Sequence, residues 1–396
     1  MRQKIRIAVA GAGQIGRRHV EVIAETADAA LAAIVDPAPG ASDYAAGLGV
    51  PHFSALGDLI ARGIADAVII ATPNQLHAQN SLECIAAGLP ILIEKPIATD
   101  SEAAAAIISA ADANGTPVLV GHHRRHNPLI QRARAELESG AIGDLVSFSG
   151  VTWFCKPDEY FEADWRRMPG AGPVYLNMIH DIDLVHYLCG AIESVHAWES
   201  NIVRGNAVEE TAVVSMKFRS GMLGTINVSD AIVAPWSWEL TARENPSYPP
   251  TTQHCYLIGG THGSLELPGL RLWRNRDKRS WWEPIDATQL PFGFEDPLRR
   301  QIRQFVAVVR GEEAPLVSGR DGLQALRVVE AVKRSAAIGA PVVAPSASGA
   351  ARRRIAPRPA AKTAGNRSSG RSRADGSGRI SGAEQDRRIG LWPKHP

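Results

Sequence analysis

The sequence predicts a protein of the α/β class, with a doubly wound parallel sheet in its N-terminal part and a mixed or antiparallel sheet after it. In the first 122 residues, short apolar runs alternate with segments of helical character, which is the order found when helices cover a parallel sheet. After residue 145, several runs with period-two alternation follow one another with few helices between them, which is typical of antiparallel strands.

Strand and helix patterns alternate along the first part of the chain. Residues 5–10 form an apolar run that ends in a glycine-rich loop, and residues 17–25 have the pattern of a helix. A second apolar run, residues 31–35, is closed by Asp36. The elements expected after it are strands at 67–71, 91–93 and 118–120 and helices at 80–87 and 101–114.

The second part of the chain begins with a helical segment at residues 128–137, and alternation starts at Val146. Further helices are expected at 177–188, 297–309 and 322–337, and strands at 195–198, 211–218, 222–229, 254–258 and 264–267. The predicted domains are residues 1–122 and 123–345, followed by a basic tail of residues 346–396.

The tail differs from the rest of the chain in composition. It is rich in Ser, Gly, Arg, Pro and Ala, so we expect it to be disordered. It holds 12 Lys and Arg against 3 Asp and Glu, whereas the rest of the chain holds 31 against 38. The expected folded part is therefore mildly acidic, which argues against nucleic acid as a partner.

No apolar run approaches the roughly 18–20 residues that cross a bilayer, and the N-terminus shows no cleavable signal pattern. We therefore expect a cytoplasmic protein without a membrane partner. Cys84, Cys155, Cys189 and Cys255 lie far apart, so neither a zinc cluster nor a disulfide framework is predicted, and no metal is expected.

A glycine-rich loop follows the first apolar run and reads Gly11-Ala12-Gly13-Gln14-Ile15-Gly16. The pattern G-x-G-x-x-G between a strand and a helix is typical of a Rossmann dinucleotide-binding site. The first glycine permits the tight turn, the second lets the backbone approach the pyrophosphate, and the third lets the helix pack close to the strand. Amide groups at the start of the helix then bind the phosphates.

Asp36 lies 20 residues after Gly16, at the end of the second predicted strand. A carboxylate at this place can accept hydrogen bonds from the adenosine ribose. It would repel a 2′-phosphate, and Pro37 supplies no positive charge to offset that repulsion. The predicted cofactor is therefore NAD rather than NADP.

Further motifs follow in a fixed order. They are Ala71-Thr72-Pro73-Asn74 with His77, then Glu94-Lys95-Pro96, then residues 120–128 with His122, His123, Arg124 and Arg125, and finally residues 170–173 leading into Ile179-His180-Asp181-Ile182-Asp183. In this order the motifs resemble the Gfo/Idh/MocA oxidoreductase family, and the resemblance covers roughly residues 4–343.

The resemblance implies a Rossmann domain and a C-terminal α/β domain with a large open, mostly antiparallel sheet, with the nicotinamide of NAD between them. It implies a dehydrogenase that transfers hydride between NAD(H) and a secondary alcohol of a sugar, polyol, sugar acid or cyclic diol. It also implies a homodimer or homotetramer formed through the open sheet. The implied cofactor contacts are the glycine loop, Asp36, Ala71, Thr72, Pro73, Asn74, His77, Glu94 and Lys95.

Lys95 is the predicted catalytic base. It follows the run 91–93 at its carboxyl end, where open α/β sheets bind their ligands. Oxidation of an alcohol needs a base for the hydroxyl proton while hydride leaves for the nicotinamide. A lysine can be that base only if burial or a neighbouring cation lowers its pKa. The alternative is an ordinary surface lysine.

His180 is the second predicted catalytic residue. The family motif has an acid four residues before this histidine, on the same helix face, but here that position is Leu176. Asn177 lies three residues before His180 and could contact the substrate, although an amide cannot act as a base. The alternatives are a buried core histidine for His180 and a helix cap for Asn177.

Three further residues are predicted to contact the substrate. Arg125 belongs with Arg124 to a cationic cluster that would suit an anionic or highly hydroxylated molecule, unless these arginines pair with carboxylates at the domain interface. Trp165 and Arg166 lie in a polar–aromatic loop. They could cover the cofactor or contact a sugar ring, or they could simply pack the loop.

Two other functions remain open from the sequence. Leu176 at the position of the missing acid also fits an enzyme that keeps NAD bound and cleaves glycosides through transient oxidation. A catalytically silent protein that senses a dinucleotide or a sugar is the third alternative. The presence of Lys95, His180 and a complete glycine loop favours an enzyme.

Overall fold

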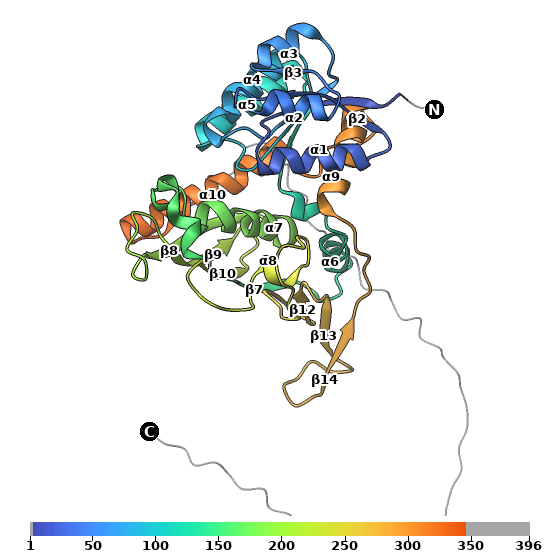
Figure 1. The fold of residues 1–396 in the computed structure, drawn as a ribbon. Helices are drawn as coiled ribbons and strands as arrows, with labels where there is room; N and C mark the ends of the chain where they lie inside the picture. The colour runs from blue at the N-terminus through green and yellow to red at the C-terminus, as the bar shows by residue number, and fades with distance from the viewer. Residues whose placement is uncertain (1–2, 346–396) are drawn as a thin grey trace, which may run out of the picture. The chain divides into compact units, whose positions relative to one another are not determined.

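The structure is a computed structural model that describes residues 3–345 (Figure 1). It confirms the predicted fold class, because it contains a six-stranded parallel sheet with helices and a second, nine-stranded sheet that is mostly antiparallel. The predicted tail at residues 346–396 lies outside the described residues.

The first sheet has the strand order β3-β2-β1-β4-β5-β6, and all neighbouring strands are parallel. The order reverses between β1 and β4, so a ligand crevice is expected at the carboxyl ends of these strands. The strands are β1 (Ile5–Ala10), β2 (Ala29–Val35), β3 (His52–Phe53), β4 (Ala67–Ile70), β5 (Ile91–Ile93) and β6 (Val118–Val120).

Helices cover both faces of this sheet because its strands are apolar on both sides. Ile7 and Val9 of β1 join a core with α1 (Gln14–Glu25), α2 (Ala41–Gly47) and α9 (Pro297–Val309). Ala8 and Ala10 join the opposite core, with α3 (Leu56–Arg62), α4 (His77–Ala86), α5 (Ser101–Asn114) and α10 (Gly319–Ile338). The short elements α2, β3 and α3 are not among the predicted ones.

The second sheet has the order β14-β13-β12-β11-β7-β10-β9-β8-β15, and only the pair β10 and β7 is parallel. The hairpin of β13 and β14 is an addition to the predicted strands. The strands are β7 (Leu145–Trp153), β8 (Ile192–Ser200), β9 (Thr211–Phe218), β10 (Leu223–Ser229), β11 (Tyr256–Gly260), β12 (Ser264–Leu267), β13 (Arg271–Asn275), β14 (Ile285–Gln289) and β15 (Val342–Val343).

One face of the second sheet packs against α6 (Pro128–Glu138), α7 (Ile179–Cys189) and α10 (Figure 1). Phe148, Val214 and Ile226 point into this core. Helix α10 contacts β6 and α5 of the first sheet as well as α7 and β8. It therefore connects the two sheets. Helix α9 packs on the first sheet although its residues lie in the range predicted for the second domain.

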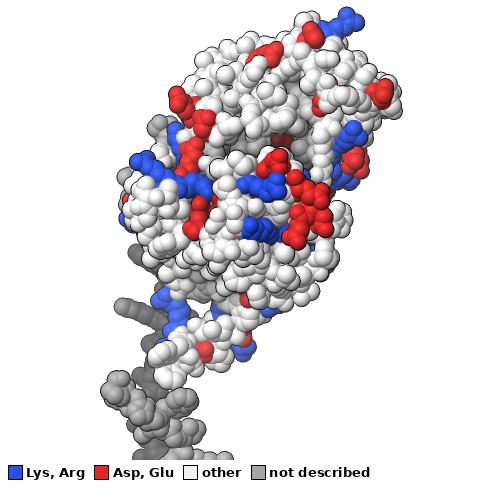
Figure 2. All heavy atoms as spheres, turned by 60° about the vertical axis from the view of Figure 1, so that its left-hand side comes forward, with Lys and Arg blue, Asp and Glu red and all other residues white. Residues whose placement is uncertain are grey.

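The surface of the protein carries charges of both signs (Figure 2), and its cysteines are not cross-linked. On the face shown in Figure 2, basic and acidic side chains lie beside one another. All four cysteines are free thiols, and of these only Cys155 is exposed. Within residues 3–345, no helix has the length and hydropathy needed to span a membrane, and no three or more His, Cys, Asp or Glu side chains form a possible metal site.

Candidate active site

The glycine loop between β1 and α1 has the space and the donors that a pyrophosphate needs. Gly11 has a φ of +97°, and a Cβ atom there would lie 2.3 Å from the carbonyl oxygen of Ala71. A Cβ atom on Gly16 would lie 1.9 Å from the carbonyl oxygen of Gly11, whereas one on Gly13 would meet only open space. No described side chain caps the N-terminus of α1. The loop therefore fits a dinucleotide phosphate.

Asp36 follows β2 and lies beside this loop. Its carboxylate accepts hydrogen bonds from the backbone amides of Ala12 (2.6 Å) and Ala38 (2.7 Å). Each carboxylate oxygen has further lone-pair capacity, so both can also accept from ribose hydroxyls. Gln14 and Ile15 of the loop are exposed. This arrangement fits the ribose contact predicted for Asp36.

The segment 71–74 follows β4, and its last three residues are partly or fully exposed. His77 lies behind this segment and has no exposed surface. Its Nδ1 atom is 2.7 Å from the carbonyl oxygen of Pro96, and its Nε2 atom is 2.9 Å from that of Thr72. His77 therefore holds together the loops after β4 and β5, and the structure does not support the direct cofactor contact predicted for it.

Glu94 follows β5 and is 7% exposed. Its Oε1 atom lies 2.7 Å from Nε2 of His19 in α1. Burial would raise the pKa of Glu94, but the hydrogen bond with His19 and the nearby charges of His19, His123 and Lys95 outweigh burial and lower that pKa to about 2. Glu94 is thus a fixed carboxylate between α1 and the end of β5.

Lys95 is partly buried and reaches the second domain. Its Nζ atom donates a hydrogen bond of 3.2 Å to the main-chain carbonyl oxygen of Leu176. Burial lowers the pKa of Lys95, and the charges of Arg124 and Lys156 act in the same direction. Glu94 opposes this effect without reversing it. A partly buried, hydrogen-bonded lysine with a lowered pKa meets the condition stated for a base.

His180 lies in the first turn of α7, directly after a π-helix at Val174–Met178. Its ring is 7% exposed, and its Nδ1 atom is buried without a partner among residues 3–345. It is therefore not the backbone-bonded core histidine of the alternative interpretation. Burial lowers the pKa of His180 well below its usual value, and the charge of Lys95 lowers it further. The site thus holds a neutral imidazole near Lys95.

The residues before His180 lie in the π-helix, a form that is frequent at functional sites. Leu176 offers Lys95 its carbonyl oxygen in place of the carboxylate of the family motif. The Oδ1 atom of Asn177 is buried and has no partner in the described part of the chain. Asn177 does not cap this helix, which starts after Pro173 without a side-chain cap.

Arg124 and Arg125 follow β6 and form buried ion pairs, and each is 4% exposed. Arg125 contacts Asp183 at 2.6 Å and Asp321 at 3.1 Å. Arg124 contacts Asp181 at 2.9 Å. The structure thus shows arginines paired with carboxylates, and it does not present Arg125 as the free cation that was predicted to contact a substrate.

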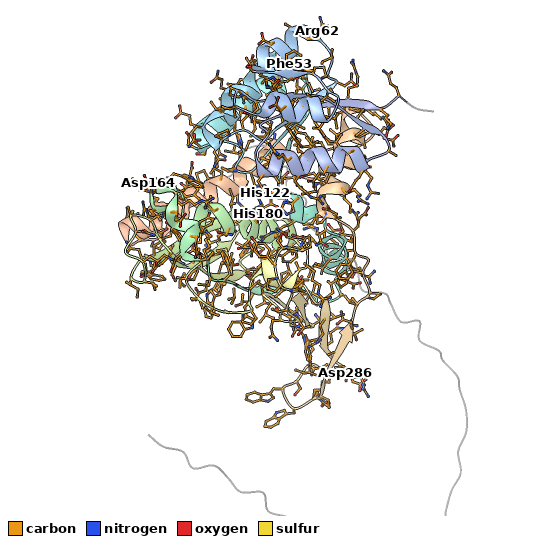
Figure 3. All side chains as sticks on the ribbon, viewed as in Figure 1. Phe53, Arg62, His122, Asp164, His180 and Asp286 are labelled. Atoms are coloured by element: carbon orange, nitrogen blue, oxygen red, sulfur yellow. The ribbon has the colours of Figure 1, made fainter. Side chains whose placement is uncertain are left out.

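Trp165 and Arg166 lie on the short helical turn Asp164–Arg167 (Asp164 is labelled in Figure 3). The guanidinium group of Arg166 is 4.1 Å above the ring of Tyr160, and its Nη1 atom donates to the Tyr160 carbonyl oxygen at 2.7 Å. Arg166 therefore packs its own loop. Trp165 is 57% exposed, and its substrate contact stays a prediction.

Two histidines outside the predicted catalytic set contact the ring of His180. The ring centroids of His122 and His123 lie 5.6 and 5.5 Å from that of His180 (Figure 3 labels His122 and His180). From the sequence they were grouped with the arginines that follow them. The sequence did contain a signal for their place in the site, because these histidines directly follow a predicted parallel strand at its carboxyl end.

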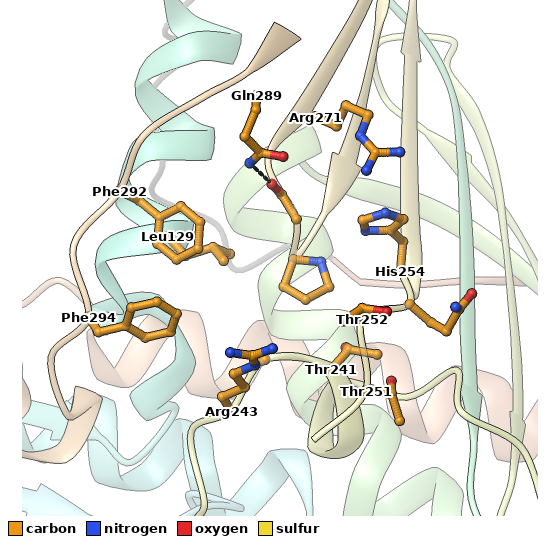
Figure 4. A pocket seen from close by; sticks show the side chains of 14 residues that line it. Leu129, Thr241, Arg243, Thr251, Thr252, His254, Arg271, Gln289, Phe292 and Phe294 are labelled. Carbon is orange, nitrogen blue, oxygen red and sulfur yellow. Dashed lines mark hydrogen bonds between the residues drawn. The ribbon is translucent and has the colours of Figure 1, made fainter. Parts of the chain in front are cut away.

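Two cavities lie outside this crevice. One, of about 270 Å³, is lined by Arg243, His254, Arg271, Phe292 and Phe294 among others (Figure 4). The second, of about 250 Å³, is lined by Glu199, Glu209 and Lys333 among others. Neither is lined by Lys95 or His180.

The parallel sheet, the open glycine loop and the carboxylate after β2 define an NAD-binding oxidoreductase. A family model described as "Oxidoreductase family, NAD-binding Rossmann fold" matches residues 5–122, and the GFO/IDH/MocA C-terminal domain model matches residues 130–266. The chain therefore belongs to the Gfo/Idh/MocA family and is an NAD-dependent dehydrogenase.

Named relatives and a solved structure agree with this assignment. The rhizopine catabolism protein MocA of Rhizobium meliloti is 25% identical, over 83% of this chain and 94% of that protein. Inositol 2-dehydrogenase of Corynebacterium glutamicum is 29% identical, over 58% of this chain and 68% of that protein. The WlbA dehydrogenase from Bordetella pertussis, solved with NADH and UDP-GlcNAcA, is 28% identical with a TM-score of 0.70, over 87% of this chain and 99% of that chain.

Proposed function

We propose that this protein transfers hydride between NAD(H) and a secondary alcohol of a polyhydroxylated or anionic small molecule: a sugar, polyol, sugar acid or cyclic diol. The contact between Lys95 and Leu176 carries this proposal. It places an amine of lowered pKa at the carboxyl end of β5, against a neutral carbonyl oxygen. Such an amine can take up the proton of an alcohol.

The cofactor is assigned to the crevice at the carboxyl ends of β1, β4 and β5. The pyrophosphate would bind at the glycine loop and the N-terminus of α1, and the adenosine ribose at Asp36. The segment 71–74 and Glu94 would lie along the nicotinamide half. When bound, NAD⁺ supplies the hydride acceptor.

Lys95 and His180 are assigned to the reacting alcohol. In the oxidation direction, the neutral amine of Lys95 accepts the hydroxyl proton, and a hydride leaves the carbon that bears this hydroxyl. The secondary alcohol thereby becomes a ketone. The ring of His180 would hydrogen bond to the alcohol oxygen and hold it toward Lys95. In the reverse direction, the ammonium group of Lys95 returns the proton.

The names of two similar proteins support the proposed substrate class. Inositol is a polyhydroxylated ring, and the WlbA dehydrogenase was solved with UDP-GlcNAcA. Asn177 and Trp165 are the remaining candidates for substrate contacts. Asn177 offers an unpartnered buried oxygen, and Trp165 offers an exposed indole ring.

The outer face of the second sheet supports a homodimer or homotetramer. Val146, Trp198, Leu223 and Leu257 are between 51% and 59% exposed on β7, β8, β10 and β11. An apolar sheet face of this kind is typical of an interface. The cytoplasmic location expected from the sequence stays a prediction.

A panel assay tests the proposed function. The full chain is incubated with NAD⁺ and with sugars, polyols, sugar acids and cyclic diols, and NADH absorbance is followed. We expect NADH with at least one member of the panel, and its loss in Lys95→Met with NADH binding retained. Lys278→Met is the control, because Lys278 is exposed on the hairpin of β13 and β14.

The same assay separates the other two functions. The absence of an acid at position 176 is compatible with an enzyme that cleaves glycosides through an internal redox cycle, which would consume substrate without net NADH. A sensor would bind NADH or a sugar without any turnover. Either result would contradict the proposed dehydrogenase reaction.

A further inference from the structure

His122 is a buried side chain whose ring has no hydrogen-bond partner. It follows β6, is 1% exposed, and neither of its ring nitrogens has a partner among residues 3–345. Its ring lies edge-on to that of His180, with centroids 5.6 Å apart and planes at 90°. Because Nδ1 of His180 is also buried and unpartnered, three such nitrogens lie in two neighbouring rings.

Buried polar atoms without partners are uncommon, because leaving them unpaired is unfavourable. The two rings are close enough to satisfy each other through a small rotation or through one bridging water. Leu176, one turn before His180, has an apolar side chain, so it cannot be a hydrogen-bond partner for the His180 ring. Oδ1 of Asn177, three residues before His180 in the chain, is also buried without a partner among residues 3–345.

Both rings are held in the neutral form. Burial lowers the pKa of His122 to about 4 and lowers that of His180 well below its usual value. A neutral imidazole has one donor nitrogen and one acceptor nitrogen, so two neutral rings can share one N–H···N hydrogen bond. The groups whose charges act on these rings are Glu94, Lys95, His123, Arg124, Arg125 and Asp183.

We propose that His122 is a positioning residue for His180. A ring N–H of His122 donates a hydrogen bond to Nδ1 of His180, directly or through one water. This bond keeps the proton of His180 on Nε2, which donates to the alcohol oxygen while Lys95 takes the hydroxyl proton. The role of Nε2 rests on the proposed function, whereas the bond between the two rings does not. The partner of a histidine generally decides which ring nitrogen carries the proton.

Nitrogen-15 NMR of the full chain labelled at histidine tests the bond without any substrate. With NADH bound, we expect the wild-type protein to show His180 protonated at Nε2. In His122→Phe this signal should change to a tautomer mixture, while His122→Asn, whose amide group can still donate, should restore it. A wild-type His180 protonated at Nδ1, or an unchanged tautomer in His122→Phe, overturns the proposal.

Kinetics with a substrate from the panel give the second readout. We expect His122→Phe to lower kcat about tenfold with little change in KM or in NADH affinity, the lower end of the effect seen when partners of metal-bound histidines are removed. His122→Asn should recover part of this loss. His262→Phe, in an exposed turn, is the control for the substitution itself.

The two readouts separate the two claims. A wild-type protein with the expected tautomer but without turnover of any alcohol would contradict the proposed function alone. If His122→Phe fails to fold, the wild-type tautomer and His122→Asn still decide. An equal kcat for all three proteins would overturn the positioning role.

Discussion

The Nζ atom of Lys95 donates a 3.2 Å hydrogen bond to the main-chain carbonyl oxygen of Leu176. This contact joins the carboxyl end of β5 to the π-helix before α7. A neutral carbonyl orients the amine, but it holds the proton on nitrogen less strongly than a carboxylate would. Leucine at this position therefore does not remove the proposed base, and it favours the unprotonated form of Lys95.

A carboxylate at position 176 should make Lys95 a weaker base near neutral pH. If unprotonated Lys95 is the base, kcat/KM rises with pH through the pKa of Lys95. Leu176→Asp should raise that pKa by about one unit or more, because an opposite charge stabilises the ammonium form. We therefore expect the rising part of the profile to move to higher pH, measured as kcat/KM against pH.

Leu176→Asn is the matched control, because it has nearly the same shape as aspartate without the charge. Its profile should stay close to that of the wild type. A profile that does not move in Leu176→Asp, or that moves equally in both variants, would contradict the electrostatic explanation.

The glycine loop should separate cofactor binding from folding. Gly13 has a φ of −71° and open space around it, so Gly13→Ala should fold normally but weaken NADH binding about tenfold or more, or roughly 1.4 kcal/mol. Gly16→Ala should lower stability by about 1–3 kcal/mol, because its Cβ atom would overlap the Gly11 carbonyl oxygen. Thermal unfolding and NADH titration measure the two effects. Equal losses of stability in both variants would be inconsistent with an open site at Gly13.

Asp36 should determine the choice of NAD over NADP. Asp36→Ala removes the negative charge next to the ribose, and we expect the ratio of NAD to NADP affinities to fall about tenfold, or roughly 1.4 kcal/mol. Asp36→Asn keeps an oxygen that can accept from Ala12 and serves to separate charge from loop geometry. Isothermal titration with both cofactors gives the ratio, and an unchanged ratio in Asp36→Ala would rule out this role.

The buried pair of Arg125 and Asp183 should matter for stability rather than for substrate binding. Asp183→Asn leaves a buried guanidinium without its main counter-charge, so we expect a loss of about 3–5 kcal/mol in the free energy of unfolding. Asp286→Asn removes the exposed pair with Arg276 and should have little effect. Urea unfolding compares the two. If Asp183→Asn is as stable as Asp286→Asn, the buried pair is not structural.

The order of elements could be predicted because hydrophobic periodicity depends on neighbouring residues. The strands 5–10, 91–93 and 118–120 have the bounds that the structure shows. The short elements α2, β3 and α3 span seven, two and seven residues, which is too short a window for a period to be recognised. The return of α9 to the first sheet depends on contacts between residues far apart in the chain, which no local pattern reports.

The candidate site could be predicted in part, for the same reason. Lys95 and His180 lie in motifs at element ends, and the structure brings Nζ of Lys95 to the main-chain carbonyl oxygen of Leu176, four residues before His180. The pairing of Arg125 with Asp183 joins positions that are distant in sequence, so charge alone suggested a free cation. The ring contact between His122 and His180 is likewise a tertiary contact, visible only once β6 and α7 are placed.

The most direct test of Lys95 as the base is the kcat/KM of Lys95→Ala for a panel substrate, measured with and without a small primary amine. We expect a loss of about 10²- to 10⁴-fold without amine, and a partial recovery that grows with pH as more of the amine becomes neutral. A Lys95→Ala enzyme that oxidises the alcohol at nearly the wild-type rate without amine would contradict the account.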